Sequence, residues 1–60
     1  MEKLLTINQL SELLQIKKST IYSWTFSKRI PYVKLHGTLR FRQKDISKWL
    51  DDKVEETKNF

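Results

Sequence analysis

The sequence has no cysteine, one proline and one glycine in its 60 residues. Without cysteine the chain forms neither a disulfide nor a thiolate metal site, and a single histidine cannot build a zinc site with histidine partners. No apolar run approaches the roughly 18 residues of a membrane span, and the N-terminus lacks the pattern of a signal peptide. We therefore expect a cytoplasmic protein with no membrane partner, no metal and no cofactor.

The chain is also too short for much internal volume. A domain of this size buries only about 60% of the surface that its unfolded chain exposes, so it has one small core and little room for a pocket. No grouping of nucleophile, base and carboxylate supports catalysis. We expect a protein that is not an enzyme.

Acidic residues are missing from the middle of the chain. Residues 15–44 carry eight basic side chains and no acid, while the segments on either side are slightly acidic, and the formal net charge is +5. A solvated surface normally mixes charges of both signs, so this segment predicts a phosphate-binding face. Its basic residues are Lys17, Lys18, Lys28, Arg29, Lys34, Arg40, Arg42 and Lys44.

A supporting helix is predicted first. Thr6 and Gln9 have the spacing of a capping box, and apolar residues then recur at helical spacing from Ile7 to Leu14. The exposed side of this helix has no basic residue. We expect this helix to support the next helix rather than to bind a partner.

A three-residue turn, 15–17, leads into a second predicted helix over 18–26. Ile21 and Trp24 are three residues apart and fall on one side. The opposite side offers hydrogen-bond donors suited to phosphate or base edges. These are Lys18, Ser19, Tyr22 and Ser23. Two short helices across so short a turn predict a helix-turn-helix, with the second as recognition helix.

The start of the second helix is unusual. Lys17 is the expected N-cap residue and Lys18 follows it, although cations at a helix N-terminus oppose the helix dipole. One interpretation is that phosphates relieve this repulsion in a complex. The other is that solvent screens both lysines and Ser19 caps the helix.

A β-hairpin is predicted after a loop at 26–30 and the extended step at Pro31. Two alternating runs, 32–35 and 39–42, flank His36-Gly37-Thr38, and Gly37 is expected to supply a positive φ. A three-residue loop is preferred because it places the apolar residues of both strands on one face. It pairs Leu35 with Leu39 and Val33 with Phe41.

That register sets Lys34 opposite Arg40 on the outer face, together with Tyr32 and Arg42. Like charges across a hairpin cost stability, so this pair also suggests a bound anion.

A closing helix is predicted to begin near Gln43 or Lys44. Its core-facing side is expected to carry Ile46, Trp49, Leu50 and Val54. Periodicity ends there, which predicts a domain over 1–55 and a frayed tail over 56–60 that includes Phe60.

Several residues have two interpretations. Trp24 and Trp49 could stack on bases, but their helical spacing favours core packing. Tyr22 suits either a phosphate contact or the edge of the core, and His36 either a backbone contact or a plain turn position. The acidic group near the C-terminus is explained by a solvated helix end rather than a metal site. It comprises Asp51, Asp52, Glu55 and Glu56.

From Leu4 to Leu50, about four-fifths of the chain, the sequence resembles a known family. The segments are L-L-T-I-N-Q-L-S-E-L-L, I-K-K-S-T-I-Y-S-W, R-I-P-Y-V-K-L-H-G-T-L-R-F-R and D-I-S-K-W-L. They are similar to the excisionase-type, MerR-like winged helix-turn-helix DNA-binding domain. The resemblance implies a mainly α fold with a small β-hairpin wing: helix, turn, recognition helix, two-stranded wing and closing helix.

The resemblance also implies a set of DNA contacts. From the second helix they are Lys17, Lys18, Ser19, Thr20, Tyr22 and Ser23, and from the wing Lys34, His36, Thr38, Arg40 and Arg42. The loop residues Lys28 and Arg29 are expected to reach the DNA backbone. The family usually has glycine where this chain has Gln15, so a strained or differently shaped turn is expected there.

Three functions follow from these observations. The first is an excisionase-like directionality factor of a phage or mobile element, which binds double-stranded DNA with cooperative self-association and steers an integrase. The second is a minimal transcriptional regulator, which would lack the dimerisation helix and effector domain of full MerR regulators. The third is a protein- or RNA-interaction module that uses the basic face.

Overall fold

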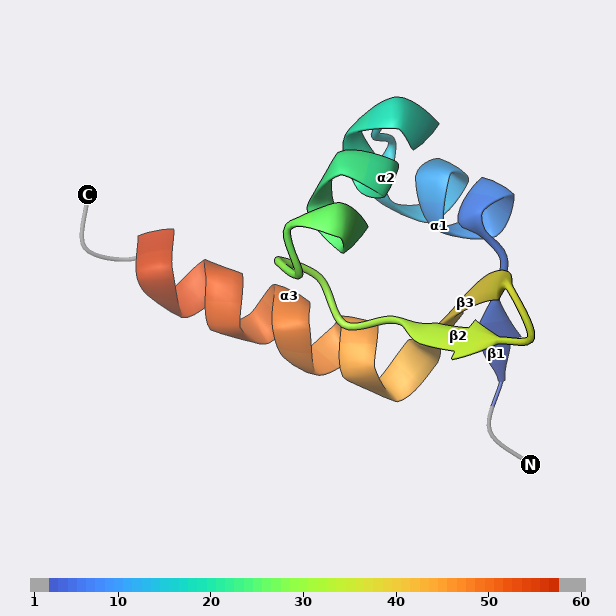
Figure 1. Ribbon diagram of the computed structural model, residues 1–60. Helices are drawn as coiled ribbons and strands as arrows, with labels where there is room; N and C mark the ends of the chain where they lie inside the picture. The colour runs from blue at the N-terminus through green and yellow to red at the C-terminus, as the bar shows by residue number, and fades with distance from the viewer. Residues whose placement is uncertain (1–2, 58–60) are drawn as a thin grey trace.

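The structure, a computed structural model, describes residues 3–57 and shows three helices and a small antiparallel sheet (Figure 1). The elements in chain order are β1 (Leu4–Leu5), α1 (Ile7–Leu14), α2 (Lys18–Phe26), β2 (Val33–Leu35), β3 (Thr38–Arg42) and α3 (Gln43–Thr57). Figure 1 shows α1 and α2 together above the sheet and α3 extending away beneath the loop that follows α2. The predicted fold, a mainly α winged helix-turn-helix, is confirmed. No described helix is long and apolar enough to cross a membrane.

The capping box at the start of α1 is formed as predicted. The Thr6 backbone N–H donates to Gln9 Oε1 at 2.9 Å, and the Gln9 backbone N–H donates to Thr6 Oγ1 at 3.1 Å. Two backbone donors that the helix itself leaves unpaired are thereby satisfied. This local signal fixes where α1 begins.

The turn between α1 and α2 is held by Ser11, a contact that the sequence analysis missed. The Ser11 hydroxyl donates to the Ile16 carbonyl at 2.6 Å, and the Ile16 N–H donates to the Ser11 carbonyl at 3.1 Å. Gln15 between them takes the left-handed conformation, with φ 56° and ψ 45°. The backbone therefore adopts a conformation that favours glycine although a glutamine occupies the position.

The sheet has one strand more than predicted. β1 pairs antiparallel with β3, with Leu4 opposite Arg42 and Leu5 opposite Phe41, so the strand order is β1-β3-β2. A two-residue strand is too short to show alternation in the sequence, which is why it was not predicted. Its pairing makes β3 the central strand and puts Phe41 against the core.

The predicted hairpin register is wrong. Val33 pairs with Arg40, Lys34 with Leu39 and Leu35 with Thr38, which leaves a two-residue turn. His36 has φ 48° and Gly37 has φ 83°. Positive φ at both central residues is typical of a type I′ turn, whose twist matches that of the strands. The positive φ predicted for Gly37 is confirmed.

The core contains one buried residue from each of β1, α1, α2, the loop after α2, β3 and α3. Its buried members are Leu5, Leu10, Ile21, Ile30, Phe41 and Ile46. Trp24 and Trp49 are half-buried against it, with ring centroids 5.8 Å apart and planes tilted by 53°. Core packing of both tryptophans is therefore confirmed.

The second half of α3 differs from the prediction. Leu50 is 38% exposed and Val54 is 59% exposed, so they do not close the core. Figure 1 shows the reason, because this part of α3 projects past the other helices. The helix also continues past Val54 to Thr57. Residues 58–60 of the predicted tail, Phe60 among them, lie outside the described residues.

Candidate nucleic-acid interface

The second helix presents two different sides, as its spacing predicted. Ile21 and Thr25 are buried, and the Thr25 hydroxyl is satisfied by donating to the Tyr22 carbonyl at 2.7 Å. Tyr22 itself is 44% exposed, so its ring lies at the surface rather than in the core. The predicted polar side is open to solvent at Lys18, Ser19, Tyr22 and Ser23, while Thr20 is half-buried.

Among the residues that the structure describes, none caps the N-terminus of α2 with its side chain. Lys17 is the N-cap residue, in an extended conformation. The alternative that Ser19 caps the helix is therefore wrong. The Lys17 carbonyl accepts from the N–H groups of Thr20 and Ile21 at 3.1 and 3.2 Å. The backbone N–H groups of the first turn of α2 thus lie next to two exposed lysines. This arrangement favours binding of an anion at this end of the helix.

The loop after α2 is held by its backbone. The Lys28 N–H donates to the Thr25 carbonyl at 3.1 Å and the Arg29 N–H to the Trp24 carbonyl at 2.8 Å, a pattern that ends a helix with a left-handed residue. Lys28 is that residue, with φ 56°. Trp49 Nε1 donates to the Arg29 carbonyl at 2.8 Å and fastens the loop to α3. The side chains of Lys28 and Arg29 remain exposed.

The two-residue turn divides the cations of the hairpin between its two faces. Paired residues share a face and neighbours alternate, so Lys34 lies with Leu39 and Phe41 on the side toward α2. Arg40 and Arg42 lie on the other side. The predicted opposition of Lys34 and Arg40 is therefore wrong, and its argument for a bound anion does not hold.

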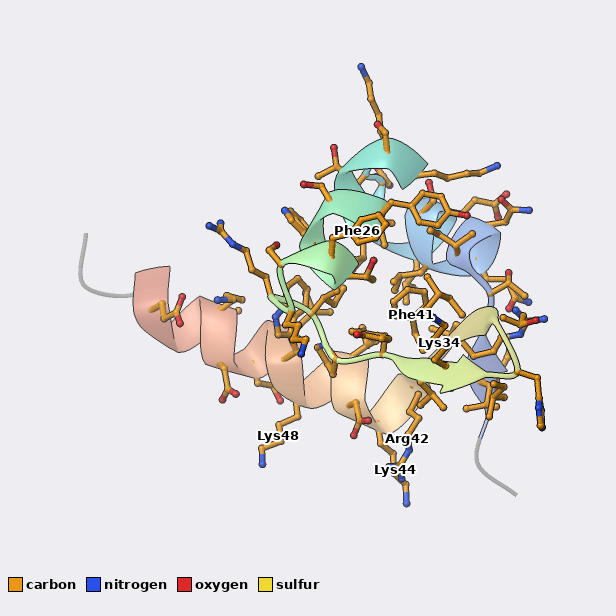
Figure 2. All side chains as sticks on the ribbon, in the orientation of Figure 1. Phe26, Lys34, Phe41, Arg42, Lys44 and Lys48 are labelled. Atoms are coloured by element: carbon orange, nitrogen blue, oxygen red, sulfur yellow. The ribbon has the colours of Figure 1, made fainter. Side chains whose placement is uncertain are left out.

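Both arginines also contact groups close to them in the sequence. Arg40 Nη1 donates to the Leu39 carbonyl at 2.7 Å, and Arg42 Nε lies 3.7 Å from Asp45 Oδ2. Figure 2 shows Arg42 pointing away from α2, together with Lys44 and Lys48. The structure thus brings Lys34 to the α2 side and leaves Arg40 and Arg42 off it. His36 and Thr38 are exposed at the hairpin tip.

A groove of about 340 Å³ separates α2 from the hairpin. Its lining residues are Tyr22, Thr25, Phe26, Tyr32, Lys34, Gly37 and Leu39. Figure 2 places Phe26 on α2 and Lys34 on the hairpin below it. Phe26 was not predicted as a surface contact, although it lies seven residues, two helical turns, after Ser19. That spacing is the signal that could have found it.

The surface of α2 and the groove is positively charged. Within the described residues no ion pair involves Lys17, Lys18, Lys28, Arg29 or Lys34. Nor does any cluster of histidine and acidic side chains in residues 3–57 have the makeup of a metal site. The arrangement is suited to phosphate and base contacts along one helix and one edge of the hairpin.

Residues 4–54 match a protein family described as "Helix-turn-helix domain", which covers most of the chain. The chain belongs to this excisionase-like family. It is therefore a helix-turn-helix DNA-binding domain, with α1 as supporting helix and α2 as the second helix of the motif. Comparisons with curated proteins and with solved structures gave no match for this domain.

Proposed function

We propose that this helix-turn-helix domain is a non-enzymatic, double-stranded DNA-binding protein that acts as an excisionase-like directionality factor. In this proposal α2 enters the major groove and the hairpin lies along the flanking backbone. The observation that carries it is the exposed cationic surface formed by Lys17, Lys18 and the open side of α2, where neither lysine forms an ion pair with a described residue. DNA phosphates supply the negative charge that this surface lacks.

In this proposal different parts of the surface make different contacts with DNA. Base edges are assigned to residues on the exposed side and first turn of α2: Ser19, Thr20, Tyr22 and Ser23. Backbone contacts are assigned to the cations and hairpin-tip residues: Lys17, Lys18, Lys28, Arg29, Lys34, His36 and Thr38. A duplex on α2 reaches Arg40 and Arg42 only by wrapping around the hairpin, because both lie on its other face.

The small DNA interface of one helix-turn-helix module supports a role in which several copies bind together. One module of this kind buries about 600–1,000 Å² on DNA, which is too little for strong specificity by itself. Several copies bound side by side, together with bending of the DNA, would supply the remaining specificity. Such an assembly changes the path of DNA near a recombination site and can present it to an integrase.

The proposal is tested by selecting bound duplexes from a random-sequence DNA library and measuring the bend in the selected sites. We expect a short motif in closely spaced direct repeats, bound cooperatively and bent. A single isolated motif without bending would favour a minimal transcriptional regulator instead. No enrichment of any duplex would contradict DNA recognition and favour a protein or RNA partner for the basic face.

A further inference from the structure

Phe26 is the most exposed large apolar side chain in the described residues. It is 87% exposed at the last position of α2. Four residues separate it from Tyr22 and seven from Ser19, so all three lie on one side of the helix. Phe26 therefore lies at the C-terminal end of the side of α2 that faces DNA in the proposed complex, next to the hairpin, and it makes almost no contribution to the core.

Phe26 is not isolated on this surface. It lines the groove between α2 and the hairpin with Tyr22 and Tyr32, which are 44% and 36% exposed, and with Leu39. Lys34 lines the same groove and Lys28 follows two residues after Phe26. The apolar ring of Phe26 thus has tyrosine hydroxyl groups and lysines as neighbours.

We propose that Phe26 reads thymine through its C5-methyl group, an inference that rests on the proposed binding of α2 in the major groove. The floor of that groove presents hydrogen-bonding groups from every base pair, and the thymine methyl is its largest apolar group. A phenyl ring donates and accepts no conventional hydrogen bond. Burial against that methyl is therefore the base contact in the major groove that suits it best.

The charge around Phe26 favours DNA as the occupant over a second copy of the chain that meets it through the same surface. Residues 15–44 carry no acid, so two copies meeting through this surface would bring like charges together. A polyanion that also carries apolar groups matches both properties of the surface. Duplex DNA with thymine in the contacted position has this chemistry.

The test replaces each thymine of the selected site in turn by deoxyuridine, which removes only the methyl group. For the wild-type domain we expect affinity to fall about fourfold at one or two positions, the loss for one buried methyl. Phe26→Ala should bind the thymine site more weakly and show no difference between thymine and deoxyuridine at those positions. Val54→Ala, an exposed apolar truncation on α3, should keep the full thymine dependence.

Three results would overturn the inference: a selected site without thymine, equal wild-type affinity for all deoxyuridine sites, or an unchanged thymine dependence in Phe26→Ala. Loss of cooperativity between adjacent sites in Phe26→Ala, with thymine dependence retained, would assign Phe26 to a protein contact and also overturn it. Because Phe26 is exposed, the variant should melt like the wild type. Failure of the wild type to bind any duplex would instead defeat the proposed function itself.

Discussion

Within residues 3–57, three residues other than glycine adopt positive φ, and each follows a helix or begins a turn. Gln15 follows α1, Lys28 follows α2 and His36 begins the hairpin turn, with φ values of 56°, 56° and 48°. A side chain in this conformation brings Cβ close to the backbone at a cost of about 1–2 kcal/mol. The neighbouring hydrogen bonds, such as that from Ser11 to Ile16, hold the backbone there.

Gln15→Gly should stabilise the domain. Glycine removes the left-handed strain but adds freedom to the unfolded chain, so we expect a net gain of about 0.5–1 kcal/mol in the free energy of unfolding. Urea denaturation followed by circular dichroism measures it. Gln15→Ala is the matched control and should give no gain, because alanine keeps the Cβ. Equal stability of the glycine and alanine variants would show that the turn is not strained.

Trp49 should stabilise the domain through its indole N–H as well as its ring. Trp49→Phe removes the 2.8 Å hydrogen bond to the Arg29 carbonyl and part of the packing against Trp24. Trp24→Phe loses comparable packing, but within residues 3–57 its indole makes no hydrogen bond. Thermal unfolding should show Trp49→Phe less stable than Trp24→Phe by about 1 kcal/mol. The reverse order would contradict a role for the loop-to-helix bond.

At the scale of elements, the three helices could be predicted because their signals are local. The capping box sets the start of α1, and apolar spacing places the buried side of α2 at Ile21. The hairpin register depended instead on the conformation of His36. Its positive φ allows a two-residue turn, whereas the apolar pattern had predicted a three-residue loop. The extra strand β1 depends on a partner almost 40 residues away, Phe41 and Arg42, which no local pattern reveals.

The candidate site, like the fold, was predicted only in part from the sequence. The open side of α2 follows from helical spacing and was found from the sequence. The groove beside it was not found, because Lys34 reaches the α2 side only in the observed register. Phe26 was predicted both as the last residue of the second helix and as the first residue of the loop, and its place on the exposed side of the helix was missed.

The observed register predicts that Lys34 and Arg42 contribute unequally to DNA binding. Lys34 lines the groove beside α2, while Arg42 points away from α2 and lies 3.7 Å from Asp45. Lys34→Ala should therefore weaken duplex binding by about three- to tenfold, and Arg42→Ala by less than twofold, in fluorescence anisotropy titrations. A greater loss for Arg42→Ala would show that DNA follows the opposite face of the hairpin.

At the scale of the whole molecule, charge is distributed unevenly over the fold. Lys17 and Lys18 lie at the N-terminus of α2 and Lys34 lines the groove beside it, whereas the acids of residues 45–57 are carried by α3. Positive charge on the α2 side attracts a polyanion from a distance, and this attraction weakens as salt rises. Affinity for DNA should then come mainly from released counterions, with α3 turned outward.

The most direct test of the account is the salt dependence of duplex binding by the wild type, Lys18→Ala and Lys48→Ala. Lys18 is exposed in the first turn of α2, while Lys48 lies on α3 and points away from α2 (Figure 2). Each neutralised phosphate contributes about 0.9 to the slope of log affinity against log salt. We predict that Lys18→Ala lowers affinity and reduces the slope by about one such contribution, while Lys48→Ala keeps the wild-type slope. An unchanged slope in Lys18→Ala, or an equal loss in Lys48→Ala, would contradict DNA binding through α2.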